Sequence, residues 1–482
     1  MLKQTKLFIY FISGLLIIWH LYTLSYSPLP WFDETFFASI THSLINGKGF
    51  CLEVGPLIDS RPIYIYGPIY FLMTSIVTSI FGFSIFMFRI VNFSFSIFVV
   101  ILLYKILRTI KIKQFIIIIS ISAFCFDTIF LQDAHSGRMD IVALFFSLFG
   151  LYTLILLPPK KSITLIGIIS LTVSLLTTPR AFVLVIPIGI YYLIKTIKNR
   201  NWENIFYFIS IPFILFYIWI RYSYGTIISF FQYYITKNKT GASLTSSYLG
   251  GNLRIPSFQY CLIIVTIGLI IVYFKQFKSN IIAKLSLAII LFFYVIINDT
   301  GLYSTLIIPF YYIIIATMLD ISDIKSKIYK IILFGILIIN FSIFSFKSLS
   351  IVFSINERNA SPIENWVKNN VTSGKKIIGD DRYFYAAIKN KCNFQYTERG
   401  ESLQEVVNYQ YNVFKPDYIF FSKQTTPEVI NEYRKLFNMS DSLIYSPNFS
   451  VNQIDFKVIR RLLYSNTTIS NCYDGTLYRI KY

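Results

Sequence analysis

The chain has 482 residues, of which 55% are hydrophobic and only 14% are charged. Soluble domains carry roughly 25% charged residues, so this composition excludes an ordinary soluble protein and indicates one that crosses a membrane several times. The net charge is +20, but Lys and Arg fall mostly in short clusters between apolar runs. Because cytoplasmic loops of membrane proteins show this pattern, we expect no nucleic-acid partner.

Apolar runs in the first 350 residues predict about eleven membrane-spanning helices. Lys3 and Lys6 place the N-terminus in the cytoplasm. The first run, 7–26, lacks a small-residue cleavage site, so we interpret it as a retained helix and not as a signal peptide. The run 70–81 is short and favours an interfacial or re-entrant helix. The later apolar runs whose two ends can be assigned are 83–104, 115–131, 163–176, 205–220 and 331–346.

The distribution of charge along the chain, here called charge parity, supports this topology. If the chain crosses the membrane at each predicted span, every strongly basic short loop lies in the cytoplasm. The outer side receives the acidic residues Asp33, Asp133, Asp140 and Asp299. The membrane core is expected to cover residues 1–350, with outer loops at 27–83, 132–140 and 221–256. Such a protein belongs in the plasma (inner) membrane, in contact with membrane lipids.

Residues 351–482 contain no further span and alternate between short strands and helices. Strands are expected at 376–379, 417–421 and 477–480, and helices at 382–389 and 427–437. This alternation indicates a small α/β domain, which charge parity places outside the cytoplasm. Two of the five cysteines, Cys392 and Cys472, lie in this part, so a disulfide between them is open.

Two adjacent carboxylates, Asp33 and Glu34, follow the first span directly. A carboxylate at a membrane surface is costly unless it is solvated or used, so the segment is either a solvated loop or part of an active site. Other candidates share the outer side of the membrane. They are Arg61 and Tyr66 in the first loop, His135, Arg138 and Asp140 in the second, and Arg180 in the third.

These residue types suit the transfer of a group from a lipid phosphate. A carboxylate can act as general base for a hydroxyl or amine, or hold a divalent cation, and arginine binds phosphate oxygens in a forked geometry. Plainer interpretations stay open. Asp140 can simply favour a helix N-terminus, and Arg89 and Arg180 can extend to lipid headgroups. His135 and Arg61 can be ordinary loop residues.

The order of the motifs resembles a known family. After Asp33-Glu34 come Asn46-Gly47-Lys48-Gly49-Phe50, Pro62-Ile63-Tyr64, Gly67-Pro68-Ile69-Tyr70-Phe71, Phe81-Gly82-Phe83-Ser84, Phe88-Arg89-Ile90 and Gly137-Arg138-Met139-Asp140. Over about residues 1–200 this resembles the GT-C glycosyltransferases of the protein O-mannosyltransferase and aminoarabinose-transferase type. The resemblance implies a multi-spanning all-α core, a polyprenyl-phosphate-sugar donor, and inverting transfer to a lipid, glycan or protein acceptor on the extracytoplasmic side.

The resemblance also implies roles for the candidate residues. Asp33 would be the catalytic base with Glu34 in support, and Asp140, with Asp133, the acidic group of the second loop. Their charge and location, more than the motifs, make Arg61, Arg138 and Arg180 the candidates for the donor phosphate. Tyr66 and His135 are further candidates for substrate binding. A divalent metal ion, if one is used, would bind at Asp33 and Asp140. Aminoarabinose transferases carry a Glu-Lys pair where this chain has Tyr66-Gly67, so the sugar stays open.

Two other classes of protein remain as alternatives. A transporter or lipid flippase would favour charges in the middle of spans and paired halves with broken helices, whereas here the acidic residues collect at span ends and the sequence shows no internal repeat. A membrane-anchored binding protein would need only one anchor helix.

Overall fold

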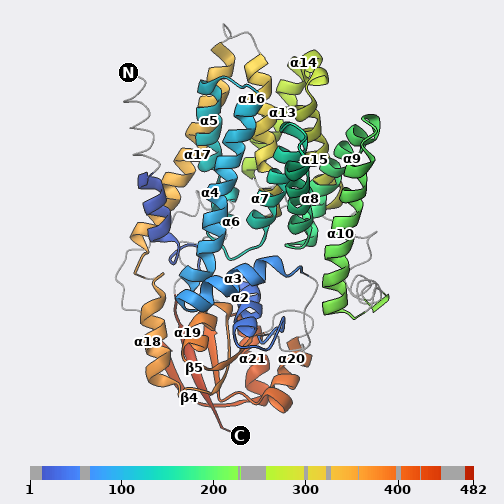
Figure 1. Ribbon diagram of the computed structural model, residues 1–482. Helices are drawn as coiled ribbons and strands as arrows, with labels where there is room; N and C mark the ends of the chain where they lie inside the picture. The colour runs from blue at the N-terminus through green and yellow to red at the C-terminus, as the bar shows by residue number, and fades with distance from the viewer. Residues whose placement is uncertain are drawn as a thin grey trace.

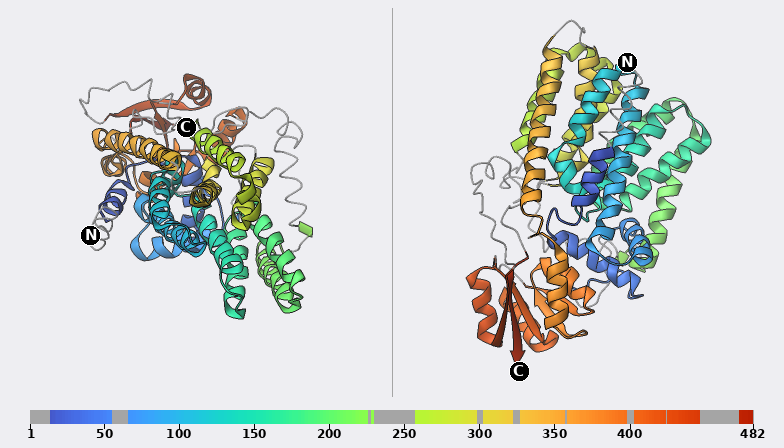
Figure 2. Two further views of the ribbon diagram at one scale, coloured as in Figure 1. Left: turned by 90° about the horizontal axis from the view of Figure 1, so that it is seen from above. Right: turned by 90° about the vertical axis from the view of Figure 1, so that its left-hand side faces the viewer.

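The computed structural model divides into a helical bundle and a smaller α/β part, with two short helices between them (Figure 1). It describes residues 14–54, 66–225, 228–229, 257–297, 302–321, 327–356, 358–397, 403–423, 425–446 and 473–481. The two intervening helices are α2 (Phe32–Ile45) and α3 (Ile69–Phe81). Figure 2 shows the same arrangement from the side, with the sheet at the far end of the bundle.

Among the described residues, four helical segments are long and apolar enough to cross a membrane. They lie in α4 (Ile85–Thr109), in Pro179–Lys198, in α10 (Trp202–Ser223) and in α17 (Lys327–Phe353). The segment Pro179–Lys198 combines a 3₁₀ turn, η2 (Pro179–Ala181), with α9 (Phe182–Lys198). A fifth span arises if α5 (Gln114–Cys125) and α6 (Thr128–Ala134), which are bent by 59° at their break, count as one.

Shorter helices complete the bundle. They are the first helix (Gly14–Thr23), α7 (Asp140–Leu151) with its π-helical extension η1 (Tyr152–Leu156), α8 (Lys161–Leu175), α13 (Ser257–Val272), α14 (Phe274–Ser279), α15 (Ile281–Ile296), the 3₁₀ turn η3 (Leu302–Leu306) and α16 (Ile308–Ile321). The chain is therefore membrane-embedded, and helices coincide with the predicted apolar runs. The number of eleven spans is not supported, because most of these helices are shorter than the roughly 20 residues that a bilayer requires.

The α/β part contains one five-stranded sheet with the order β2-β1-β3-β5-β4. The strands are β1 (Lys376–Gly379), β2 (Asn393–Tyr396), β3 (Tyr418–Ser422), β4 (Asn438–Tyr445) and β5 (Gly475–Lys481). β1 pairs in parallel with β2 and β3, while β5 runs antiparallel to β3 and β4. The strands predicted near 376, 417 and 477 are confirmed, and β2 and β4 were not foreseen.

Helices pack beside this sheet (Figure 1). They are α18 (Ala360–Asn370), η4 (Asp381–Tyr383), α19 (Phe384–Lys389), α20 (Leu403–Tyr409), η5 (Gln410–Phe414) and α21 (Pro427–Leu436). The predicted helix 382–389 begins as the 3₁₀ turn η4 and continues as α19, and the one at 427–437 corresponds to α21. Cys472 lies outside the described residues, so its pairing with Cys392 stays a prediction.

The carboxyl end of β2 docks on α2 of the membrane part. The Tyr396 hydroxyl donates to the Thr35 Oγ1 at 2.8 Å, and the Tyr396 ring lies 5.2 Å from that of Phe32. Close by, Phe83 and Tyr385 stack with ring centroids 5.7 Å apart. These contacts hold the α/β part against α2, which carries Asp33 and Glu34, and against the connection between α3 and α4.

Candidate active site

The centre of the site is Arg138, which lies in the short connection between α6 and α7. Its side chain is almost fully buried. The Nη1 donates to Asp33 Oδ2 at 2.5 Å and the Nε donates to Asp140 Oδ2 at 3.0 Å, while Asp133 Oδ1 is 3.6 Å from the Nε. Burial acts to lower the pKa of Arg138, but the three surrounding carboxylates hold it above its ordinary value.

Asp33 is the carboxylate of this group that is partly exposed at the surface of the protein. Its side chain keeps 32% of its accessible surface, whereas Asp133 and Asp140 are buried. Its Oδ2 accepts the hydrogen bond from Arg138, and within the described part of the chain nothing donates to its Oδ1. Asp33 therefore presents a fixed carboxylate with one oxygen available to a ligand.

Aromatic rings surround the cationic groups. The guanidinium carbon of Arg138 lies 5.3 Å from the ring centre of Trp31 and 4.8 Å from that of Tyr303. Arg180 approaches the same Tyr303 ring, at 3.9 Å, and the Tyr66 ring at 6.0 Å. These distances allow cation–π attraction, so Tyr303 joins the two arginines in one cluster.

Arg180 differs from Arg138 in having no carboxylate within 4.0 Å among the described residues. Its side chain is partly exposed. Burial raises the pKa of the neighbouring Tyr66, and Arg180 acts against that rise. The cluster thus contains one guanidinium that is surrounded by three carboxylates and one that has no carboxylate within 4.0 Å on the described chain.

Glu34 points away from Asp33 into the protein. It forms a two-pronged ion pair with Arg89 of α4, with Nε to Oε1 at 2.6 Å and Nη2 to Oε2 at 2.7 Å. Arg89 also donates from Nη1 to the Leu24 carbonyl at 2.8 Å, and both side chains are fully buried. Burial raises the pKa of Glu34, while Arg89 and the Gly137 amide oppose that rise. The interpretation of Arg89 as a residue reaching toward lipid headgroups is therefore wrong.

Two glycines allow the loops to approach closely. A Cβ on Gly137 would lie 2.1 Å from the Phe88 ring and 3.0 Å from Glu34 Cγ. A Cβ on Gly67 would lie 1.8 Å from the Leu176 carbonyl oxygen. Gly137 thus lets the Arg138 turn pack on the Glu34–Arg89 pair, and Gly67 seats Tyr66 on the end of α8, next to Arg180.

Two sequence candidates are not part of this cluster. His135 is buried, with Nε2 2.9 Å from His20 Nδ1 and Nδ1 3.2 Å from the Ser27 carbonyl oxygen. These contacts do not include Asp33, and the predicted role of His135 in substrate binding stays a prediction. Arg61 lies outside the described residues, so its role stays a prediction.

The group between Asp33 and Asp140 is a guanidinium. Among the described residues no three His, Cys, Asp or Glu side chains are arranged to hold a metal ion. A cation shared by Asp33 and Asp140 would have to displace Arg138 from its contacts with both. These residues, as arranged here, do not fit a bridging metal, and the divalent ion considered from the sequence stays untested.

No family model and no curated protein matches the sequence. ArnT from Cupriavidus metallidurans bound to undecaprenyl phosphate matches with a TM-score of 0.58 and 11% identity, covering 98% of each chain. The same protein in the apo state matches with a TM-score of 0.60 and 10% identity, covering 99% of this chain and 98% of that one. The chain has the GT-C fold.

This finding confirms the resemblance drawn from the motifs of the first 200 residues and extends the shared fold over nearly the whole chain. Three contributors to the site were not recognised as such from the sequence: Arg89, Trp31 and Tyr303. Trp31 directly precedes the acidic pair, and Tyr303 follows a predicted outer turn, so an aromatic residue in an outer loop was the available signal for both.

Proposed function

We propose that the protein is an integral membrane glycosyltransferase that moves a sugar from a polyprenyl-phosphate donor to a lipid, glycan or protein of the cell envelope. The observation that carries this proposal is that an accessible carboxylate and an available guanidinium lie in the same cluster. Asp33 keeps one oxygen open, and Arg180 has no carboxylate partner on the described chain. Both belong to the cluster that Tyr303 and Arg138 hold together.

In the proposed reaction Asp33 is the general base. It takes the proton from the acceptor hydroxyl or amine, whose heavy atom attacks the anomeric carbon of the donor sugar. The bond from that carbon to the phosphate oxygen breaks, and the electron pair leaves with the polyprenyl phosphate. A single displacement of this kind inverts the anomeric centre. Arg138 fixes the orientation of Asp33 throughout.

Arg180 is the stronger candidate for the departing phosphate. Arg138 directs its donors at Asp33 and Asp140, whereas the guanidinium of Arg180 is held by ring contacts that leave its N–H donors available. A guanidinium placed before the reaction stabilises charge as it develops on the leaving group. The ArnT structure of the same fold contains undecaprenyl phosphate, which supports a lipid-phosphate donor.

Glu34 has a positioning role in this scheme. Because both of its oxygens bind Arg89 in the core, it anchors α2 and thereby the neighbouring Asp33. We also propose that the α/β part lies outside the cytoplasm, on the same side as the site. Reporter fusions after Lys160 and after Ser354 test this, with the first expected inside and the second outside.

The decisive experiment measures sugar transfer from a panel of radiolabelled polyprenyl-phosphate sugars with purified protein and crude envelope acceptors. Asp33→Asn should abolish transfer. Asp441→Asn, at an exposed aspartate of β4, is the matched control and should retain it. Full activity of Asp33→Asn would remove the base from the mechanism. Absence of transfer from every donor, with folded protein, would favour the transporter or flippase class.

A further inference from the structure

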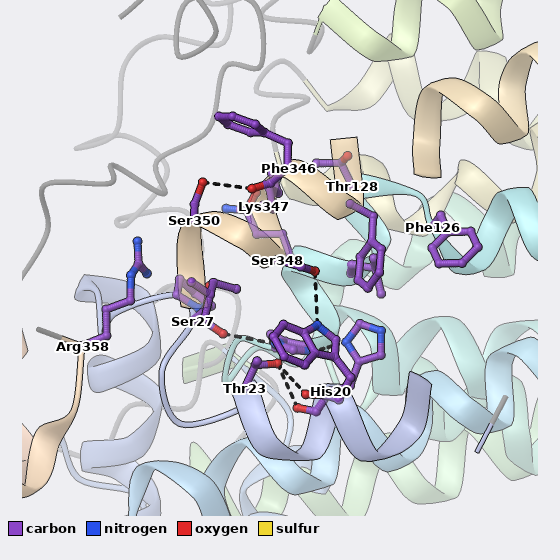
Figure 3. A pocket seen from close by; sticks show the side chains of 17 residues that line it. His20, Thr23, Ser27, Phe126, Thr128, Phe346, Lys347, Ser348, Ser350 and Arg358 are labelled. Atoms are coloured by element: carbon purple, nitrogen blue, oxygen red, sulfur yellow. Dashed lines mark hydrogen bonds between the residues drawn. The ribbon is translucent and has the colours of Figure 1, made fainter. Parts of the chain in front are cut away.

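A pocket lies between the first helix, α6 and the end of α17 that leads to the α/β part (Figure 3). Its walls include Trp19 and His20 of the first helix, Leu131 of α6, Phe344 and Lys347 of α17, and Arg358 just beyond. Neither Asp33 nor Arg180 lines it. This pocket is therefore distinct from the candidate active site.

The charge of this pocket has one sign. Lys347 and Arg358 line it, and its described lining contains no Asp or Glu. Arg358 donates from Nε to Ser354 Oγ at 2.8 Å. Lys347 has no hydrogen-bond or ion-pair partner on the described chain. Asp127 is the nearby acid, but it forms no ion pair with Lys347 within 4.0 Å, and its Oδ1 caps α6 by accepting from two backbone amides.

A half-buried ammonium without a partner is unfavourable in apolar surroundings, so an anion would stabilise this arrangement. Aromatic groups form much of the remaining wall, and the Trp19 Nε1 donates across it to Ser348 Oγ at 3.2 Å. The ligand that fits therefore combines a negative group at Lys347 with an apolar portion.

The two helices beside the pocket expose large apolar side chains. On the first helix Ile18 is 64% exposed, and on α17 Leu349 is 55% exposed. In a membrane-embedded bundle such side chains face acyl chains. An apolar chain that leaves the pocket between these helices therefore continues along a lipid-facing surface.

We propose that this pocket binds the phosphate of an anionic phospholipid, with Lys347 as its ion-pair partner and the acyl chains against the first helix and α17. Free phosphate shares the headgroup chemistry. The apolar walls and the exposed flanking side chains select the lipid as the source. The site is separate from the donor site, and its occupancy does not depend on the proposed transfer reaction.

Native mass spectrometry of the purified full-length chain tests this, after addition of phosphatidylglycerol or phosphatidylcholine. Lys347→Gln should weaken phosphatidylglycerol retention by about tenfold, as expected for loss of one charge-assisted contact. Lys105→Gln removes the same charge from an exposed position on α4 and should leave retention unchanged. Ile351→Trp fills the pocket without changing charge and should also weaken retention, so the test stands even if Lys347→Gln fails to fold.

Three outcomes would overturn the proposal. Equal retention by Lys347→Gln and Lys105→Gln would show that Lys347 does not bind the headgroup. Retention of phosphatidylcholine as strong as that of phosphatidylglycerol would remove the charge selection. Displacement of phosphatidylglycerol by inorganic phosphate at comparable concentration would assign the pocket to the free anion.

Discussion

Neutralising Asp33 and neutralising the adjacent Glu34 are expected to affect different properties, sugar transfer in the first case and stability of the fold in the second. Asp33→Asn should abolish sugar transfer while the protein remains folded. Glu34→Gln should destabilise the fold first, and lose activity only as a consequence. The same chemical change at consecutive positions thus separates the base from the residue that anchors its helix.

The magnitudes follow from the contacts of each side chain. Glu34→Gln leaves the buried Arg89 charge without its carboxylate partner. Breaking a buried ion pair in this way lowers the free energy of unfolding by about 3–5 kcal/mol. Asp33→Asn weakens one hydrogen bond at a side chain that is still partly exposed, a loss of about 1 kcal/mol. Arg138 keeps its contacts with Asp140 and Asp133 in that variant.

Thermal unfolding in detergent, followed by intrinsic fluorescence, measures these effects alongside the transfer assay. We expect Glu34→Gln to melt roughly 5 °C or more below the parent chain, and Asp33→Asn to melt close to it. The double variant Glu34→Gln, Arg89→Met removes both charges and should recover much of the loss, because an apolar pair of similar volume tolerates burial. If Glu34→Gln melted like the parent yet lost transfer, Glu34 would act in catalysis and our assignment of its role would be refuted.

Three further outcomes are expected. Arg180→Gln should raise the KM for the donor about tenfold, measured from initial rates over donor concentration, and an unchanged KM would exclude it from phosphate binding. Tyr303→Leu should lower the rate several-fold through loss of ring contacts worth about 0.5–2 kcal/mol, whereas Tyr303→Phe should retain most activity; equal loss in both would assign the effect to the hydroxyl. Gly67→Ala places a Cβ against the Leu176 backbone and should reduce the folded yield and the melting temperature, while Gly268→Ala, with no atom within 4 Å, should not.

Local patterns in the sequence carried much of the architecture. The apolar runs coincide with helices, and the strand predicted at 376–379 matches β1 to the residue. β2 has only four residues and no clear alternation. β4 (Asn438–Tyr445) mixes polar and apolar residues at an edge of the sheet. Neither pattern could be distinguished from a loop without its neighbour, since pairing across a sheet is a tertiary property.

Charge parity explains why the predicted number of spans exceeded what the structure supports. Parity counts apolar runs between basic clusters, but it cannot measure helix length. The runs around α7 and α8 produce helices that end near Pro158 and Leu175 and are too short, taken singly, to cross a bilayer upright.

The candidate site was recoverable only in part, because its contacts join distant segments. Asp33 and Arg138 were selected separately for their charge and their side of the membrane, and the structure brings them together across 105 residues. Arg89 was misread for the same reason: inside an apolar run, nothing local indicates whether an arginine reaches outward to lipid or inward to Glu34, 55 residues away. His135 was selected, like Arg138, from the second predicted outer loop, but its Nε2 lies 2.9 Å from His20 Nδ1.

The geometry of α2 accounts for the division of labour between the carboxylates. Successive residues on a helix point about 100° apart, so three neighbours can serve three different parts of the protein. Glu34 binds Arg89 in the bundle, Thr35 accepts from Tyr396 of the α/β part, and Asp33 accepts from Arg138 while staying partly exposed. One turn of helix therefore joins the membrane core, the sheet and the open carboxylate. The position of Asp33 is therefore set by the contacts that both parts of the chain make with α2.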